Sequence, residues 1–225
     1  MESQKRYQSH LLVAAASVIA GLSFLFGIAV YVAFFASYGN LAHAVSPQLK
    51  LMSANSTLLH TWYFVIYIVF GVALVAFQVG IKPYLYKGVV ASIAMIFGYF
   101  WAALTIVTGM LANVSTHVIL ELMDEQRDVA ISLWYTMQLL IDSIGGGNEL
   151  VGSIWLVGLG LSLRSIHAID RWLKAVALVF GGVGLLTAIP MLTELGGIFG
   201  FGSMAWFLVM GRYQFELYQK EKVNV

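Results

Sequence analysis

The segment LLVAAASVIAGLSFLFGIAVYVAFFA, residues 11–36, decides the fold class of this chain. It contains no charged side chain and no proline. The hydrocarbon core of a bilayer is about 30 Å thick, and a helix needs roughly 20 apolar residues to cross it. We therefore interpret residues 11–36 as a transmembrane helix.

The composition of the whole chain agrees with this interpretation. Of 225 residues, 60% are hydrophobic and 10% are charged, whereas an ordinary soluble domain is roughly 45–50% apolar and about 25% charged. This excludes a soluble enzyme, a nucleic-acid-binding protein and a disordered chain. Cysteine is absent, which excludes disulfides, thiolate metal sites and cysteine nucleophiles.

Six apolar segments predict an all-α polytopic transmembrane bundle of six helices, forming one integral membrane domain over residues 1–225. The apolar runs are continuous rather than alternating, which favours helices over membrane strands. The expected spans are residues 11–36, 58–79, 89–112, 146–163, 172–192 and 198–211.

The charges predict the orientation of this bundle. With six spans, the two termini and the loops on their side of the membrane hold ten of the twelve Lys and Arg residues. The opposite side holds seven of the eleven acidic residues. Because basic loops remain in the cytoplasm, we expect both termini to be cytoplasmic.

Residues 116–145, between the third and fourth spans, are too polar to cross a bilayer. Apolar residues at three- and four-residue steps from Ala130 to Ile144 predict an extracytoplasmic amphipathic helix, lying on the outer membrane surface or over the bundle. We expect Gly145–Gly147 to end this helix. Asn148 and Glu149 would then cap the N-terminus of the fourth span.

Two patterns bear on how the helices pack. Small residues at four-residue spacing, such as Ala94, Gly98 and Ala102, allow close helix contacts within the bundle, or with a second copy or another membrane protein. The span over residues 58–79 instead carries aromatic residues all round. This pattern suggests a helix that faces lipid or one wall of an apolar cavity, and we favour the lipid-facing helix.

Several polar residues near the outer ends of the spans are candidate ligand-binding residues. An ionisable side chain in a bilayer is costly and therefore indicates function, although residues close to the interface also serve as solvated or capping groups. We predict an outer-facing pocket that binds or passes a small molecule or ion, with His60 and Glu149 as its polar anchors. The candidates are His60, Asn113, His117, Asn148 and Glu149.

Two other functions remain open from the sequence. His60, His117 and Glu149 would match the two-nitrogen, one-carboxylate ligand set of catalytic zinc, which suggests a membrane metalloenzyme, and paired histidines could hold haem. No HExxH spacing supports the zinc site, and no cofactor is strongly implied. Alternatively, the chain is a structural or accessory subunit that docks through its small-residue stripes. The sequence favours a non-enzymatic role.

Three stretches carry a resemblance to a known family. They are GNELVGSIWL at residues 147–156, RWLK at residues 171–174 and GLLT at residues 184–187. In these stretches the chain resembles a bacterial family of small six-helix membrane proteins that is catalogued only as a domain of unknown function. The resemblance implies a bacterial inner-membrane protein and implies no activity, substrate or site residue.

Overall fold

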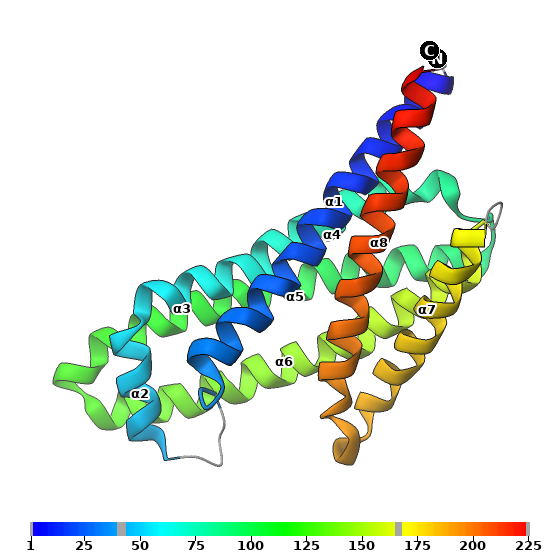
Figure 1. Ribbon diagram of the computed structural model, residues 1–225. Coiled ribbons are helices and arrows are strands. Elements are labelled where there is room, and N and C mark those ends of the chain that lie inside the picture. The colour runs from blue at the N-terminus through cyan, green and yellow to red at the C-terminus, as the bar shows by residue number, and fades with distance from the viewer. Residues whose placement is uncertain (1, 40–43, 165–167, 224–225) are drawn as a thin grey trace.

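The computed structural model describes the backbone of residues 2–39, 44–164 and 168–223, with side chains except those of residues 2–6, 145–148, 168, 190 and 223. The described chain is about 92% helical and contains no strand, which confirms the all-helical class (Figure 1). The elements are α1 (Glu2–Val30), η1 (Tyr31–Phe35), α2 (Val45–Ala54), α3 (Ser56–Tyr63), η2 (Phe64–Val69), α4 (Phe70–Ile81), η3 (Lys82–Tyr84), α5 (Val89–Glu125), α6 (Arg127–Ser162), α7 (Ala168–Leu185), η4 (Leu186–Ala188), η5 (Pro190–Leu192) and α8 (Leu195–Val223).

Five helical stretches in the described part are long and apolar enough to cross a membrane. The fourth expected span, residues 146–163, is not among them, and it begins in residues whose side chains lie outside the described part. The five stretches are Tyr7–Phe35, Ser56–Tyr84, Val89–Glu125, Ile169–Ala188 and Leu195–Lys222. Their length and apolar character indicate a membrane protein.

Within residues 116–145, the helix predicted over about residues 128–144 is present as part of α6, but the prediction that it is separate from the fourth span is wrong. Helix α5 continues to Glu125, the chain turns at Gln126, and α6 runs without a break through Gly145–Gly147 to Ser162. A glycine costs a helix only about 1 kcal/mol relative to alanine, and packing of α6 against α5 along the hairpin outweighs that cost. The predicted capping role of Asn148 and Glu149 is also wrong, because both residues lie inside α6.

The last two expected spans also differ from the helices observed. Helix α7 ends at Leu185 and is followed by the short turns η4 and η5, whereas α8 extends well beyond residue 211 to Val223. The extension of α8 packs against α1, and the Tyr7 hydroxyl donates to the Tyr218 hydroxyl at 2.6 Å. The N- and C-terminal ends of the chain therefore lie side by side (Figure 1).

The interpretation of residues 58–79 as a lipid-facing helix is wrong for three of its six aromatic residues, which are buried. Phe70 and Phe77 are buried in an aromatic core with Trp155, Trp206 and Phe207. Composition alone does not tell which face of a helix meets a neighbour, and this helix packs against both α1 and α5. We call the five buried residues Phe70, Phe77, Trp155, Trp206 and Phe207 the aromatic core.

One polar side chain joins three helices inside the aromatic core. The Gln78 amide nitrogen of α4 donates to the Met95 carbonyl of α5 at 3.2 Å. The Trp155 indole of α6 donates to the Gln78 amide oxygen at 3.0 Å. A Cβ at Gly98 would overlap the Gln78 amide, so glycine provides the space for this bridge.

A second buried group lies at the far end of the α5–α6 hairpin, where α2 and α3 pack against α6. The Tyr38 hydroxyl donates to the Met52 sulfur at 3.4 Å and accepts from the Gln138 amide at 3.5 Å. Tyr63 and Trp134 complete the group, and all five side chains are buried. We call these five residues the distal core.

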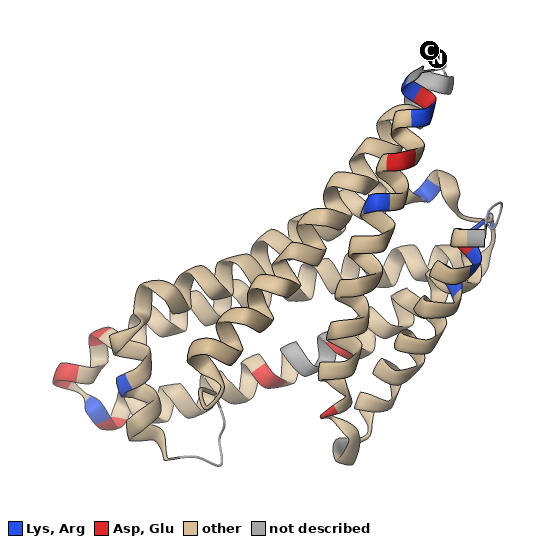
Figure 2. Ribbon diagram, viewed as in Figure 1, with Lys and Arg blue, Asp and Glu red and all other residues tan. Residues whose placement is uncertain are grey.

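The two ends of the molecule differ in charge. Lys and Arg gather at the end that holds both termini, η3 and the α6–α7 connection, whereas acidic residues gather at the tip of the α5–α6 hairpin and in the middle of α6 (Figure 2). The basic end is tied together by an antiparallel bridge between Leu85 and Leu163. The sequence-based division of charges between two sides is thus a division between two ends of the fold.

Candidate functional site

His60 and Asn113, predicted separately from the sequence, form a hydrogen-bonded pair between α3 and α5. The His60 Nδ1 lies 2.7 Å from the Asn113 Oδ1. The Asn113 amide nitrogen donates to the Gly109 carbonyl at 3.1 Å, so Oδ1 is left to accept from the imidazole. His60 therefore carries its proton on Nδ1, and Nε2 is available as an acceptor in the neutral ring.

Glu149 lies where α6 meets the start of α8. Its carboxylate packs against the backbone of Gly196, where an added Cβ would overlap it. The Thr187 hydroxyl is within bonding reach of the same carboxylate and lies 2.7 Å from the Gly184 carbonyl. Because a hydroxyl has one proton, Thr187 donates to only one of these acceptors at a time.

Asp142 is a second carboxylate on the same face of α6. It precedes Glu149 by seven residues, which is two helical turns or about 10 Å. Gly152 of α6 lies against Trp101 of α5, and Gly158 lies against Ala94. Continuing this antiparallel register places both carboxylates level with the middle of α5. Partial burial raises the pKa of the Asp142 carboxyl above its usual range.

Tyr67 lies near the two carboxylates, and it follows His60 by seven residues along a continuous helical stretch. It belongs to the π-helical segment η2, and it lies within electrostatic range of both Asp142 and Glu149. Its Cβ lies where a side chain at Gly109 would be placed, one turn from Asn113. A π-helical turn inside a longer helix frequently marks a functional site.

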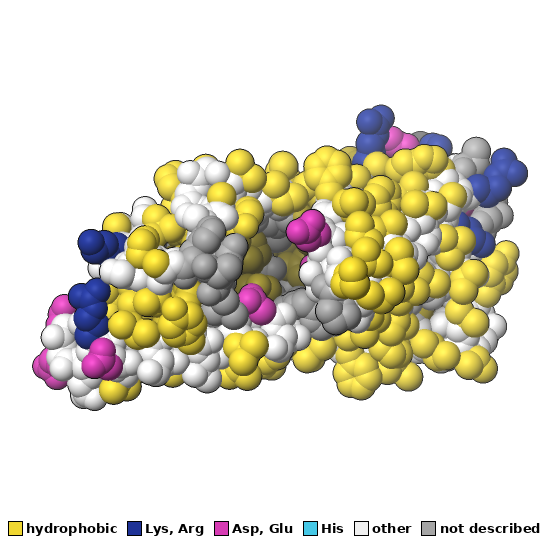
Figure 3. All heavy atoms as spheres, turned by 90° about the horizontal axis from the view of Figure 1, so that it is seen from below, with side chains coloured by type: hydrophobic (Ala, Val, Ile, Leu, Met, Phe, Trp, Pro, Cys, Tyr) yellow, Lys and Arg dark blue, Asp and Glu magenta, His cyan; other side chains and the backbone are white. Residues whose placement is uncertain are grey.

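One face of the protein has a hollow in its surface (Figure 3). Seen from below, this face is hollowed near its middle, with acidic side chains at the rim among apolar ones (Figure 3). Acidic residues occur in the middle of α6 and just before the start of α8 (Figure 2). They are Asp142, Glu149 and Glu194.

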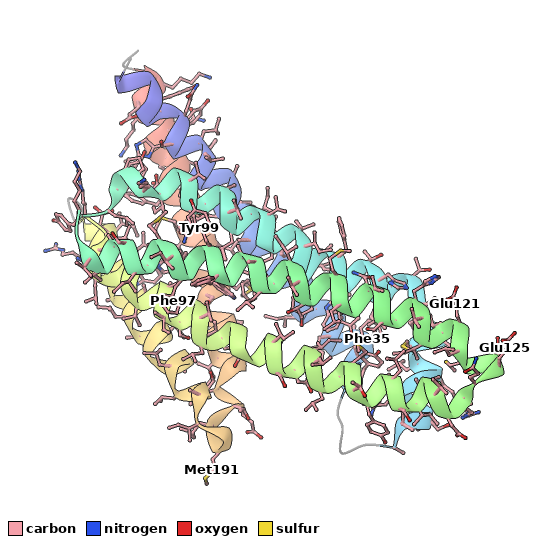
Figure 4. The ribbon with its side chains drawn as sticks, turned by 180° about the vertical axis from the view of Figure 1, so that it is seen from behind. Phe35, Phe97, Tyr99, Glu121, Glu125 and Met191 are labelled. Carbon is pink, nitrogen blue, oxygen red and sulfur yellow. The ribbon has the colours of Figure 1, made fainter. Side chains whose placement is uncertain are left out.

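His117 belongs to a different region. Its Nε2 lies 3.3 Å from Glu121, one turn further along α5, and both side chains are more than half exposed. Glu121 and Glu125 lie at the tip of the α5–α6 hairpin, whereas Met191 marks the turn before α8 (Figure 4). His117 is therefore part of the exposed tip. For Asn148, the remaining candidate residue, the side chain lies outside the described residues.

The predicted metal ligands do not converge in the described part of the chain. His60 bonds to Asn113, His117 pairs with Glu121, and Glu149 packs against Gly196. Among the described residues, no three His, Asp or Glu side chains are grouped so that they could hold a metal ion. The geometry therefore does not favour zinc at His60, His117 and Glu149.

The sequence interpretation missed Asp142 and Tyr67 as site residues. Residues seven positions apart lie on the same face of a helix. The spacing of Asp142 and Glu149 therefore indicates that they lie together, but only if both belong to one helix, as they do in α6. No comparable signal exists for Tyr67, because its position depends on the π-helical turn and on the register between α5 and η2.

Comparison with protein-family models, with curated proteins and with solved structures found no significant match for this chain.

Proposed function

We propose that this chain is a six-span integral membrane protein whose outer hollow binds or passes a small organic cation. Five spans are the long apolar helices, and the second half of α6 would supply the remaining crossing, between α5 and α7. Close contacts support that position, because Gly158 of α6 lies against Ala94 and Gly181 of α7 lies against Val157.

The proposed orientation has both termini in the cytoplasm. The basic end contains the termini, η3 and the α6–α7 connection (Figure 2), and basic segments are retained on the cytoplasmic side. The α5–α6 hairpin would then reach outward. Its helices have 37 and 36 residues, about 55 Å at 1.5 Å per residue, and so exceed a bilayer core of about 30 Å.

The observation that carries the ligand class is that two carboxylates lie within electrostatic range of Tyr67. Asp142 and Glu149 both act electrostatically on Tyr67, and a positive charge placed among them would be attracted by both carboxylates and by the face of the phenol ring. The apolar surface around the hollow (Figure 3) favours an organic cation over a hydrated metal ion.

The His60–Asn113 pair is the proposed second anchor. With its proton on Nδ1, His60 presents Nε2 as an acceptor for an N–H group of the ligand. Asn148, which directly precedes Glu149 in the sequence, remains a proposed ligand-binding residue. His117 is not part of the proposed site.

We also propose that the chain belongs to the bacterial six-helix family that it resembles and is located in the inner membrane. The stretches at residues 147–156, 171–174 and 184–187 support this. A role as an accessory subunit is a weaker candidate, because Gly98, Gly158 and Gly181 use their small size for contacts within the chain.

Binding of tetraphenylphosphonium to the detergent-purified protein tests the ligand class. Tetraphenylborate has nearly the same size and the opposite charge, so it controls for simple partition into apolar surface. We expect tetraphenylphosphonium to bind and tetraphenylborate not to bind. Glu149→Gln should weaken binding by about tenfold or more, since a charge-assisted contact contributes roughly 1.5–3 kcal/mol.

The matched control is Glu121→Gln, which removes the same charge at the exposed hairpin tip and should leave binding unchanged. Equal binding of the two probe ions, or equal affinity in the Glu149 and Glu121 variants, would contradict the proposed site.

A further inference from the structure

The basic end of the fold contains a second site, separate from the outer hollow. Two backbone hydrogen bonds join η3 and the end of α6, from Tyr86 N to the Ser162 carbonyl at 2.8 Å and from Arg164 N to the Tyr84 carbonyl at 3.0 Å. These bonds hold the α4–α5 turn against the α6–α7 connection. The basic residues of both segments are therefore held together, although they are far apart in the sequence.

Arg164 is oriented by this junction. Its Nε donates to the Leu85 carbonyl at 3.2 Å, and its guanidinium carbon lies 6.0 Å from the centre of the Tyr86 ring. A guanidinium has five N–H donors, and among the described residues the Leu85 carbonyl is the one acceptor that Arg164 binds. Two parallel N–H groups of an oriented guanidinium match two oxygens of a phosphate.

The positive charge around Arg164 is not balanced by the described acidic residues of this end. Glu216 pairs with Arg212 at 3.0 Å, and Glu221 lies 3.4 Å from His10. Asp170 hydrogen-bonds to the neutral Tyr213 and keeps its negative charge, so it offsets one of the five basic charges named below. No ion pair with a described residue involves the basic side chains of the junction and of the start of α7. They are Lys82, Lys87, Arg164, Arg171 and Lys174.

Exposed aromatic residues place this cluster at the membrane surface. Tyr86 is 55% exposed beside Arg164, and Trp172 is 46% exposed next to Arg171. Tyr and Trp gather at the depth of the lipid headgroups. The cations of the junction therefore lie level with the phosphates of the adjoining leaflet.

We propose that Arg164, with Lys87 and the basic start of α7, binds the phosphate of an anionic phospholipid in the cytoplasmic leaflet. This inference rests on the membrane position of the basic end in the proposed function, and it does not depend on the cation site. The cytoplasmic leaflet is the one that carries anionic lipids, and the guanidinium fork distinguishes a phosphate from general surface charge.

Native mass spectrometry of the detergent-purified protein tests the site. Phosphatidylglycerol or phosphatidylcholine is added in equal amounts, and the fraction of protein that retains lipid is measured. We expect wild type to retain phosphatidylglycerol in preference. Arg164→Gln should reduce that retention by about tenfold, as expected for loss of a charge-assisted hydrogen-bonded contact.

Two further variants separate binding from folding and from bulk charge. Lys87→Gln, at an exposed position with no bond to a described residue, should reduce retention without affecting the junction. Arg212→Gln removes an equal charge at the same end, from a residue already paired with Glu216, and should leave retention unchanged.

Three results would overturn the lipid site. They are equal retention of the two lipids, equal loss of phosphatidylglycerol in the Arg164 and Arg212 variants, and full displacement of phosphatidylglycerol by inorganic phosphate, which would indicate a site for the free anion. Because this readout uses no organic cation, its failure is distinguishable from failure of the outer site.

Discussion

The aromatic core and the distal core are both buried, but they are stabilised in different ways. The aromatic core consists of large rings in direct contact, such as Phe77 with Trp155 at 5.6 Å between centroids. The distal core joins a short helix and a chain turn to α6 through the Tyr38 hydroxyl and the Gln138 amide. The first therefore depends mainly on ring packing, whereas the second combines apolar packing with side-chain hydrogen bonds.

This difference predicts where the molecule loosens first. In the aromatic core, long helices contribute many ring contacts, so no single segment can leave without disrupting the rest. In the distal core, α2 has only ten residues, and its attachment depends on a few side chains. Segments with few buried contacts open locally at low free energy.

The largest expected effect is that of Gly98→Leu in the aromatic core. A Cβ at residue 98 would overlap the Gln78 amide and lie 2.6 Å from the Trp155 ring. Overpacking of a core costs up to about 3 kcal/mol and sometimes more. We expect no folded monomer on size-exclusion chromatography in detergent. Gly182→Ala is the matched control, because nothing lies within 4 Å of an added Cβ there, and it should elute as wild type does.

The second effect concerns the polar bridge of the aromatic core. Gln78→Met leaves the Trp155 indole N–H buried without its acceptor, which costs about 1–3 kcal/mol. Adding Trp155→Phe removes the unpaired donor, so the double variant should lose less stability than the two single losses together. Additive losses, measured from unfolding midpoints in detergent, would show that the bridge contributes nothing.

A smaller effect is expected in the distal core. Gln138→Met removes a side-chain hydrogen bond to Tyr38 and should cost about 1 kcal/mol. Hydrogen exchange should become faster in α2 and at residues 36–39, while α4 and the inner half of α5 stay protected. Uniformly faster exchange in both regions would mean that the two cores unfold as one unit.

The smallest effects compare two histidines, His60 and His117. His60→Ala breaks the half-buried bond to Asn113 and should lower stability by roughly 1 kcal/mol. His117→Ala removes only an exposed pair with Glu121, and such pairs contribute little, so its melting temperature should not change. Equal shifts for the two variants would contradict the distinction between the hollow and the hairpin tip.

The sequence predicted the helical class because long uncharged apolar runs have few alternatives to a membrane helix. It failed at Gly145–Gly147, where local propensity indicated a helix end and packing between α5 and α6 keeps the helix intact. It also failed for Phe70 and Phe77, because an aromatic residue suits a lipid face and a protein core equally well.

For the candidate site, the sequence supplied residue types without their geometry. His60 and Asn113 were selected as polar residues near the outer ends of two helices, and the fold brings them into hydrogen-bond contact. Tyr67 was not selected, because its approach to Asp142 and Glu149 depends on inter-helix register. His117 shares the chemistry of His60 but lies on an exposed part of α5.

Cysteine labelling in intact cells tests the proposed orientation most directly. The chain contains no cysteine, so single substitutions report without background. A membrane-impermeant maleimide should label Glu125→Cys at the hairpin tip, and it should label Lys87→Cys at the basic end only after the membrane is permeabilised. Labelling of Lys87→Cys but not of Glu125→Cys in intact cells would reverse the orientation and place the hollow on the cytoplasmic side.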